Sequence, residues 1–334
     1  MRFFTYTSIV VLGLVGLVLS FPPSLEAKGA SVEEDFEPPM PGHDLRARAN
    51  EWPDYRTIGL GSCGSVFEIP GTEFAVKKGK NTHALWNDFC LTNKVHNAVA
   101  DTRDMIQDAF PENTIPKSPS CNFFRTPGSD LYWKANINKF PASHREIGAA
   151  FQVDRIHPLP HSVREALIKQ YFDDEVREEA RNDKENEACL IRIYLGENET
   201  GNEDYDSLRN FPMRLSMVKK LDLDKTLLAD EMAIALAMIH WQAQVDAMDA
   251  EFVLGNKYLV PAFIGNDPYY PRPDVDTELW TRFSKTYLKA SRLVLRNKQV
   301  SSQAMGLPEI FLDRVASKIK EHEDWDPEGH IMFG

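Results

Sequence analysis

The sequence predicts an α+β protein with two lobes, a small antiparallel β lobe and a larger, mainly helical lobe. Short β-type runs separated by glycine and proline turns occupy residues 58–78. Apolar residues recur at helical spacing through residues 227–245 and 274–322. Hydrophobic residues make up 43% and charged residues 26% of the 334-residue chain, which is enough for a packed core.

The composition excludes two classes of function. The net charge of −12 argues against a nucleic-acid-binding surface, which needs clustered Lys and Arg, so we expect no nucleic-acid partner. Cys63, Cys90, Cys121 and Cys189 show no C-x-x-C spacing, and no paired histidines follow them, so we expect no zinc site. We expect these cysteines to be reduced or buried.

Residues 1–20 resemble a secretory signal peptide. Arg2 gives a positive start, Ser8–Leu19 is apolar but short for a membrane span, and Val18 and Ser20 offer a small-residue cleavage site. This favours the secretory pathway or export. The alternatives are an uncleaved signal anchor, which would add a membrane partner, and a mis-assigned start codon, which would leave the protein in the cytoplasm or nucleus. The sequon at Asn198 would suit secretion. Residues 21–54 read as a disordered linker.

A glycine-rich motif opens the small lobe, which we place at residues 55–156. Gly59, Gly61 and Gly64 have G-x-G-x-x-G spacing, Val66 follows, and Lys77 ends an Ala-Val-Lys triplet. A dinucleotide-binding fold would continue with a helix, whereas this motif continues with β-type residues 65–69 and 74–76. A glycine hairpin followed by a strand lysine is the protein-kinase arrangement, in which both contact ATP phosphates. The alternative is an ordinary β-hairpin with glycines at positive φ.

The next two elements complete this lobe. Residues 82–100 have a helical apolar stripe with Thr82 as a candidate N-cap. A kinase helix here supplies a glutamate to the strand lysine, but Asp88 is the only acid available, and the alternative makes it an exposed helix residue. Residues 101–150 read as irregular because of their prolines. Residues 149–156 read as a buried strand, with Asp154 and Ile156 at the hinge that would take the adenine.

The large lobe, at residues 157–322, is predicted to be mainly helical. Ser162–Arg181 reads as one helix with Ser162 as its cap and Glu165 completing a capping box, and Cys189–Leu195 reads as a strand. Residues 196–209 form a polar loop. Leu227–Val245 is apolar on two faces and should be a central buried helix.

Asp246 follows that helix at the position of a kinase catalytic base, which accepts the proton of a substrate hydroxyl. Gln244 and Val245 replace the usual His-Arg pair. Glu251 replaces the metal-binding asparagine, although a carboxylate is also a ligand for Mg²⁺. Asp249 is a substitute base. The alternative is that these acids only end a helix, with His240 and Trp241 as core packing.

Two further helices are expected near the end of the chain. Asp274–Leu295 carries one apolar face made of Leu279, Phe283, Tyr287 and Leu295. Pro308–His322 carries another, made of Ile310, Val315 and Ile319. Trp280 and Trp325 read as packing residues, and residues 323–334 as a flexible tail.

The ordered motifs resemble one fungal family. They are IGLGSCGSVFE, LWNDF, DRIHPLP, CLIRIYLG, RNFPMRLSMVKKLDL, AMIHWQAQVDAMDAEFVLG and NDPYYPRP, over roughly residues 50–296. The family is a domain of unknown function of filamentous ascomycetes described as "zinc finger protein". The resemblance implies a divergent protein-kinase-like fold and no established activity.

The resemblance also implies one departure. In the family, FVLG is followed by a Leu-Asp-Phe strand whose aspartate stands where a kinase holds Mg²⁺. Here Gly255 leads through residues 256–261 directly to AFIGNDPYYPRP, so we expect the metal-binding strand to be absent, by loss or by an omitted exon. Asp267 belongs to the later segment and does not replace that aspartate. A competent kinase needs that metal charge.

Three functions follow as expectations. The first is a catalytically inactive, pseudokinase-type binding or regulatory module with a protein or small-molecule partner. The second is a weak ATP-dependent phosphotransferase using ATP and Mg²⁺, with Lys77 on the phosphates, Asp246 as base and Glu251 on the metal. The third is a structural or interaction protein that binds no nucleotide.

Overall fold

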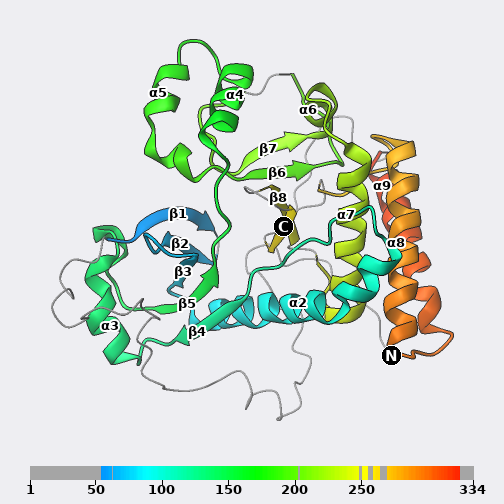
Figure 1. Ribbon diagram of the computed structural model, residues 1–334, viewed down its shortest axis with the longest axis horizontal. Helices are drawn as coiled ribbons and strands as arrows, with labels where there is room; N and C mark the ends of the chain where they lie inside the picture. Colours follow the sequence, from blue (N-terminus) through cyan, green and yellow to red (C-terminus); the bar gives the residue numbers. More distant parts are fainter. Residues whose placement is uncertain are drawn as a thin grey trace. The chain divides into compact units, whose positions relative to one another are not determined.

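The computed structural model describes residues 54–61, 63–201, 204–247, 250–254, 259–263 and 269–323 (Figure 1). The predicted signal segment, nearly all of the predicted linker, Asp249, Trp325 and all but the first residue of the predicted tail lie outside these residues. The described part is an α+β structure with two small sheets. None of its helices is long and apolar enough to cross a membrane. All four cysteines lie in the described part, where they form no disulfide.

The chain divides into two compact units. The first contains the residues up to Phe89 together with Cys121–Arg155. The second contains Cys90–Ser120 and the residues from Ile156 onward. The boundary falls inside one helix, α2 (Thr82–Ala109), and residues 90–120 therefore group with the larger unit rather than with the sheet of the first.

The first unit is built on a five-stranded antiparallel sheet with the order β1-β2-β3-β5-β4. Its strands are β1 (Arg56–Gly61), β2 (Gly64–Glu68), β3 (Phe74–Gly79), β4 (Cys121–Arg125) and β5 (Ala149–Asp154). The strands predicted around the glycine motif and before residue 156 are confirmed. One face of the sheet carries the small core of this unit, in which Phe67 and Val76 pack with Tyr55, Trp133 and Phe140.

Residues 101–150 are far more ordered than their prolines suggest, so the irregular interpretation was wrong. α2 continues to Ala109 because the first of those prolines is Pro111, and Val95, Val99 and Ile106 are fully or nearly fully buried. β4, α3 (Asp130–Asn136) and two 3₁₀ turns (Ile137–Lys139 and Ala142–His144) follow. The start of α2 also differs, since Asn81 rather than Thr82 accepts the N–H of Ala84, at 3.0 Å.

The second unit contains a four-stranded sheet with the order β7-β6-β8-β9. The strands are β6 (Ile191–Tyr194), β7 (Phe211–Arg214), β8 (Ala250–Leu254) and β9 (Leu259–Phe263). β6 and β7 are parallel, whereas β8 pairs antiparallel with both β6 and β9. The predicted strand at 189–195 is confirmed in its central residues, and the described residues of the predicted loop at 196–209 form no helix or strand.

Two adjacent helices, α7 (Lys225–Ala237) and α8 (Thr277–Asn297), form the centre of the helical part (Figure 1). Every residue of α7 from Ala229 to Ala237 is buried, as its two apolar faces predicted. The four residues predicted for the inner face of α8 are buried as well. α6 (Leu215–Lys220) precedes α7, and α9 (Leu307–Glu323) follows α8. On α9 the prediction for Ile310 was wrong, because this side chain is 46% exposed and Leu312 is buried instead.

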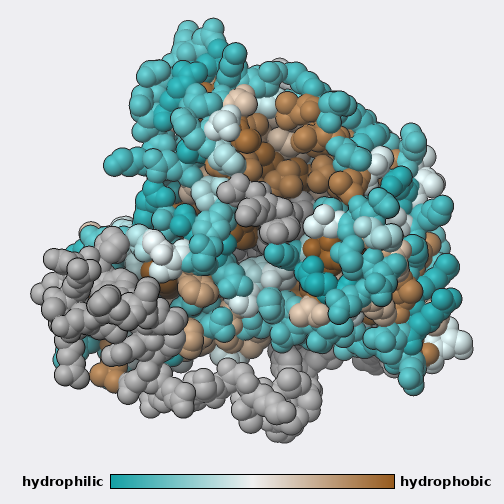
Figure 2. Space-filling model, viewed as in Figure 1, coloured by the Kyte–Doolittle hydropathy of each residue, from teal (hydrophilic) through white to brown (hydrophobic). Residues whose placement is uncertain are grey.

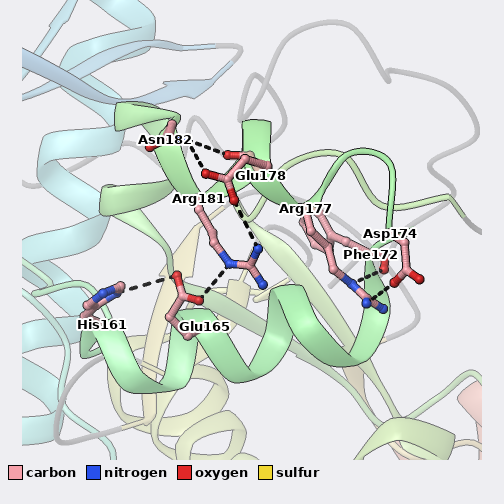
Figure 3. A network of polar contacts seen from close by, with 8 residues as sticks. All are labelled: His161, Glu165, Phe172, Asp174, Arg177, Glu178, Arg181 and Asn182. Atoms are coloured by element: carbon pink, nitrogen blue, oxygen red, sulfur yellow. Dashed lines mark hydrogen bonds and ion pairs between the residues drawn. The ribbon is translucent and has the colours of Figure 1, made fainter.

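The predicted helix at 162–181 is two helices, α4 (His161–Tyr171) and α5 (Arg177–Asn182). The chain leaves the helix at Phe172, whose backbone is extended and whose ring is buried. Arg177 holds the break by donating from Nε to the Phe172 carbonyl at 2.9 Å and by pairing with Asp174 (Figure 3). Ser162 makes no cap, since Pro160 occupies the N-cap position without a side-chain bond.

One ion pair joins the two short helices, and a second lies within α5. Arg181 donates from Nε to Glu165 at 3.0 Å and from Nη1 to Glu178 at 3.5 Å (Figure 3). Hydrophilic residues cover this part of the surface in the space-filling view (Figure 2). Glu165 therefore links α4 to α5 instead of completing a capping box.

Candidate functional site

The glycine hairpin and the strand lysine share one row of the first sheet. Gly59 pairs with Val66, Val66 with Lys77, and Lys77 with Phe151, across β1, β2, β3 and β5. Residues directly opposite each other on paired strands project to the same face. The predicted contact residues Val66 and Lys77 therefore lie side by side on one face of the sheet, next to the hairpin that contains Gly61 and Gly64.

Lys77 forms an ion pair with Asp88. Its Nζ lies 2.6 Å from Oδ2 of Asp88, and the two side chains are 16% and 8% exposed. Phe89 helps to hold this turn of α2 near the sheet, because its ring packs against that of Phe151 with the ring centroids 5.5 Å apart. Asp88 is thus a buried partner of the lysine, which rules out the alternative that it is an exposed helix residue.

Lys78 points to the opposite face, as the alternation of strand residues requires. It is 5% exposed, and its Nζ lies 5.8 Å from the ring centre of Trp133 and 5.6 Å from that of Phe140. Burial lowers the pKa of Lys78. Two adjacent lysines of the sequence thus have different environments, and among the residues that the structure describes only Lys77 has a carboxylate partner within 4 Å.

Gly64 is a glycine of the motif that is required because a neighbouring strand leaves no room for a side chain. Its φ is +156°, and a Cβ on this residue would lie 2.4 Å from the carbonyl oxygen of Lys78. A Cβ on Gly59 would meet Val66 at an ordinary 3.4 Å. A close approach of β2 to β3 therefore explains Gly64 without any ligand, whereas sterics of the fold do not explain Gly59.

Of the two predicted hinge residues, only Asp154 lies in the first unit, and it is not on the face that carries Lys77. Asp154 is the last residue of β5 and pairs with Phe74, so alternation places its side chain on the face opposite Lys77. Ile156 belongs to the second unit. The candidate site of the first unit therefore consists of the hairpin, Val66, Lys77 and Asp88.

The second unit presents Asp246 on an irregular loop. The π-helix η4 (Met238–Ala243) directly precedes it, and Gln244 and Ala247 have left-handed backbones with φ of 56° and 58°. A non-glycine residue in this region costs roughly 1–2 kcal/mol. Such strained segments cluster at functional sites, as π-helical turns do. Asp246 itself is exposed.

His240 holds this loop, a role that the sequence interpretation missed. Trp241 donates from Nε1 to the Tyr287 hydroxyl at 3.1 Å, so that hydroxyl can donate to Nδ1 of His240 at 2.8 Å. The remaining ring nitrogen, Nε2, then donates to the Asp246 carbonyl at 2.9 Å. Burial lowers the pKa of His240 to about 4, which keeps the ring neutral at pH 7. In the sequence, the one indication that His240 fixes the loop is its place in the His240-Trp241 pair shortly before Asp246.

Glu251, the predicted metal ligand, lies on β8 and is 3% exposed. Arg192 on the neighbouring strand β6 balances its charge, with Nη1 3.0 Å from Oε1. A cation at Glu251 would compete with this guanidinium. The ion pair with Arg192 therefore neutralises the Glu251 carboxylate without a metal ion.

A strand that the sequence analysis did not predict follows β8. β9 pairs with β8 over five residues, from Ala250 opposite Phe263 to Leu254 opposite Leu259. Its sequence, LVPAF, contains no Asp or Glu. β9 therefore supplies no carboxylate of the kind expected from the family's Leu-Asp-Phe strand.

The comparison with protein families bears on this same region. A family model for a domain of unknown function described as "Zinc finger protein" matches residues 243–299. The match covers the Asp246 loop, β8, β9 and α8, and is narrower than the resemblance inferred from the motifs. Comparisons with curated proteins and with solved structures gave no match.

The residues do not fit the zinc in that description. Residues 243–299 contain neither cysteine nor histidine, and zinc fingers bind the metal through these side chains. Within the ranges that the structure describes, no three His, Cys, Asp or Glu side chains gather where they could hold a metal ion.

Proposed function

We propose that this protein is a kinase-like binding module that takes ATP on its glycine hairpin and Lys77 and does not catalyse phosphoryl transfer. The observation that carries the proposal is the buried ion pair of Lys77 and Asp88. Its lysine lies beside Val66 on the same face of the sheet. In protein kinases the strand lysine contacts ATP phosphates and pairs with an acid from the following helix. Asp88 supplies that acid with a side chain one methylene shorter.

The positions that would have to bind Mg²⁺ argue against catalysis. Phosphoryl transfer depends on cations that neutralise charge developing on the transferred group. Glu251 is already paired with Arg192, and β9 carries no acid. Losing one such electrostatic contact commonly costs about 3–4 kcal/mol in the barrier. These observations support binding rather than turnover.

A thermal-shift titration with ATP, with and without Mg²⁺, tests the proposal. We expect ATP to raise the melting temperature of the full chain without a requirement for Mg²⁺. Occupancy at 100 times Kd adds about 2.7 kcal/mol to stability, which is readily measured. Lys77→Ala should abolish the shift. Lys80→Ala is the matched control, because this nearby lysine forms an exposed ion pair with Glu146.

Absence of an ATP shift in the wild-type protein, at concentrations up to several millimolar, would overturn nucleotide binding. It would favour the third function, a structural or interaction protein. The steric need for Gly64 supports that alternative, because it explains part of the motif without a ligand.

A weak phosphotransferase is the second candidate, and the strained loop at Asp246 favours it. An exposed carboxylate on a loop that His240 fixes is suited to accept a proton from a hydroxyl. Mg²⁺-dependent ADP release that Asp246→Asn removes would establish this activity. The same variant should retain the ATP shift if the protein only binds.

A further inference from the structure

The segment between β6 and β7 carries a modification signal that the proposed function does not use. Asn198-Glu199-Thr200 is an N-x-T sequon, and the residue after it is Gly201 rather than proline. It is the one sequon of the chain. Asn198 and Thr200 are exposed and lie outside any helix or strand, as an acceptor site in a folded protein must.

The residues on each side of Asn198 are fixed, so its side chain faces solvent for a structural reason. The carbonyl of Glu197 accepts the N–H of Leu215 at 3.0 Å, and its carboxylate pairs with Arg214 at 2.8 Å. Glu199 donates its N–H to the Ser216 hydroxyl at 2.9 Å and accepts from the same hydroxyl at 3.1 Å. Both acids therefore turn toward β7 and α6, while Asn198 turns away.

A glycan on Asn198 would displace none of the stabilising contacts that the structure describes. Asn186 shows the opposite case, since it is buried, donates to the Ala180 carbonyl at 2.9 Å and accepts from the N–H of Leu208 at 2.7 Å. A substituent there would break the core of the second unit. The sequon thus occupies a place where a bulky, hydrophilic group is tolerated.

The N-terminal sequence supplies the second condition, entry into the secretory pathway. Residues 1–20 have the charge, apolar length and small-residue site of a signal peptide. An acceptor asparagine must reach the lumen of that pathway to meet its transferase.

We propose that Asn198 is N-glycosylated. The amide nitrogen of Asn198 attacks the anomeric carbon of a polyprenyl-diphosphate-linked oligosaccharide. A C–N bond forms, the C–O bond to the diphosphate breaks, the amide proton passes to a base of the transferase, and the polyprenyl diphosphate leaves. The Thr200 hydroxyl is the group that the transferase recognises. This inference is independent of nucleotide binding.

The test is expression of the full chain, with its own residues 1–20, in a eukaryotic secretory host. Treatment with an N-glycan amidase should increase gel mobility, and mass spectrometry should find Asn198 converted to aspartate. Asn198→Gln and Thr200→Ala should each remove the mobility change, whereas Thr200→Ser should keep it. Asn182→Gln is the matched control, because Asn182 is also exposed but is not in a sequon.

An unmodified full-length protein would overturn the proposal. A second chain, with residues 1–20 replaced by an established secretory leader, tells which step failed. Modification of that chain alone would mean that the native N-terminal segment does not export the protein. No modification of either chain would mean that the site itself is not recognised.

Discussion

The Nζ of Lys77 lies 2.6 Å from Oδ2 of Asp88, and both side chains are largely removed from solvent. The pair joins β3 to the second turn of α2 within the first unit. A buried pair of this kind is costly to break from one side, because the remaining charge keeps its desolvation penalty without a partner. This relationship makes the pair testable apart from any ligand.

Removing both partners should destabilise the protein by less than the sum of the two single losses. We expect Asp88→Leu and Lys77→Met each to lower the free energy of unfolding by about 3 kcal/mol. The double variant should lose clearly less than the sum, giving a coupling of about 1–3 kcal/mol. Urea denaturation of the four proteins measures this cycle, and additive losses would contradict a direct pair.

Gly64 and Gly59 should differ sharply in their tolerance of a methyl group. Gly64→Ala forces a Cβ to within 2.4 Å of the Lys78 carbonyl oxygen, so we expect a loss of about 1–3 kcal/mol from backbone shifts. Gly59→Ala meets only an ordinary contact at 3.4 Å and should cost less than about 1 kcal/mol. Equal melting temperatures for the two variants would show that β2 and β3 do not approach so closely.

His240 should make stability fall in acid. Its pKa is about 4 in the folded protein and 6.5 ordinarily, so the unfolded chain binds the proton first as pH falls. The stability that the neutral ring contributes is complete above pH 6.5 and declines toward pH 4, by on the order of 3 kcal/mol. His240→Gln should lack this decline. Unfolding free energies of both proteins across that range should therefore converge at low pH, and a constant difference would refute the assignment.

Ionisation of Glu231 should lower the free energy of unfolding as pH rises, the opposite of the effect of His240. It lies on α7, is 6% exposed, and accepts the N–H of Thr114 at 3.2 Å. Burial raises its pKa from 4.5 to about 7, so its contribution to stability is present in acid and is lost as pH rises through that interval. Glu231→Gln keeps an acceptor for Thr114 but cannot ionise. Relative to the wild type, the variant should gain unfolding free energy on the order of 3 kcal/mol between pH 4.5 and 8, measured by urea denaturation.

The left-handed residues of the Asp246 loop offer one further test. Glycine adopts φ near 56° without the steric cost that Gln244 bears. We expect Gln244→Gly to be neutral or stabilising by up to about 1 kcal/mol, after its added entropy in the unfolded chain. Val245→Gly is the control, because it removes a buried side chain and should destabilise. Destabilisation of equal size by both would mean that Gln244 makes contacts that matter more than its backbone.

Periodicity predicted the elements that pack through one clear face. The inner face of α8 and the double face of α7 followed directly from the spacing of their apolar residues. Prolines were over-interpreted between residues 101 and 150, because a proline ends a helix only where it occurs, and α2 ends just before Pro111. The break at Phe172 could not be predicted, since it depends on a buried ring and on Arg177 reaching back to a carbonyl.

The site was predictable only in part, for a similar reason. Motif spacing identified Lys77 and Asp88 as candidate partners, and their ion pair is present. The partners of Glu251 and His240 are Arg192, 59 residues earlier, and Tyr287, 47 residues later, and no local pattern links such positions. The strand β9 was missed because the expectation rested on an aspartate that its sequence lacks.

The π-helix before Asp246 makes the length of this stretch as informative as its residues. A π-helical turn closes bonds from residue i to i+5, so it contains one residue more than an α-helical turn. A relative with a single deletion between Met238 and Ala243 would close the stretch as an α-helix and enter the loop in nearly the same direction, because the π-helical turn absorbs one extra residue. A relative that keeps all six residues but closes them as an α-helix would instead enter the loop rotated by about 100° and direct the aspartate elsewhere.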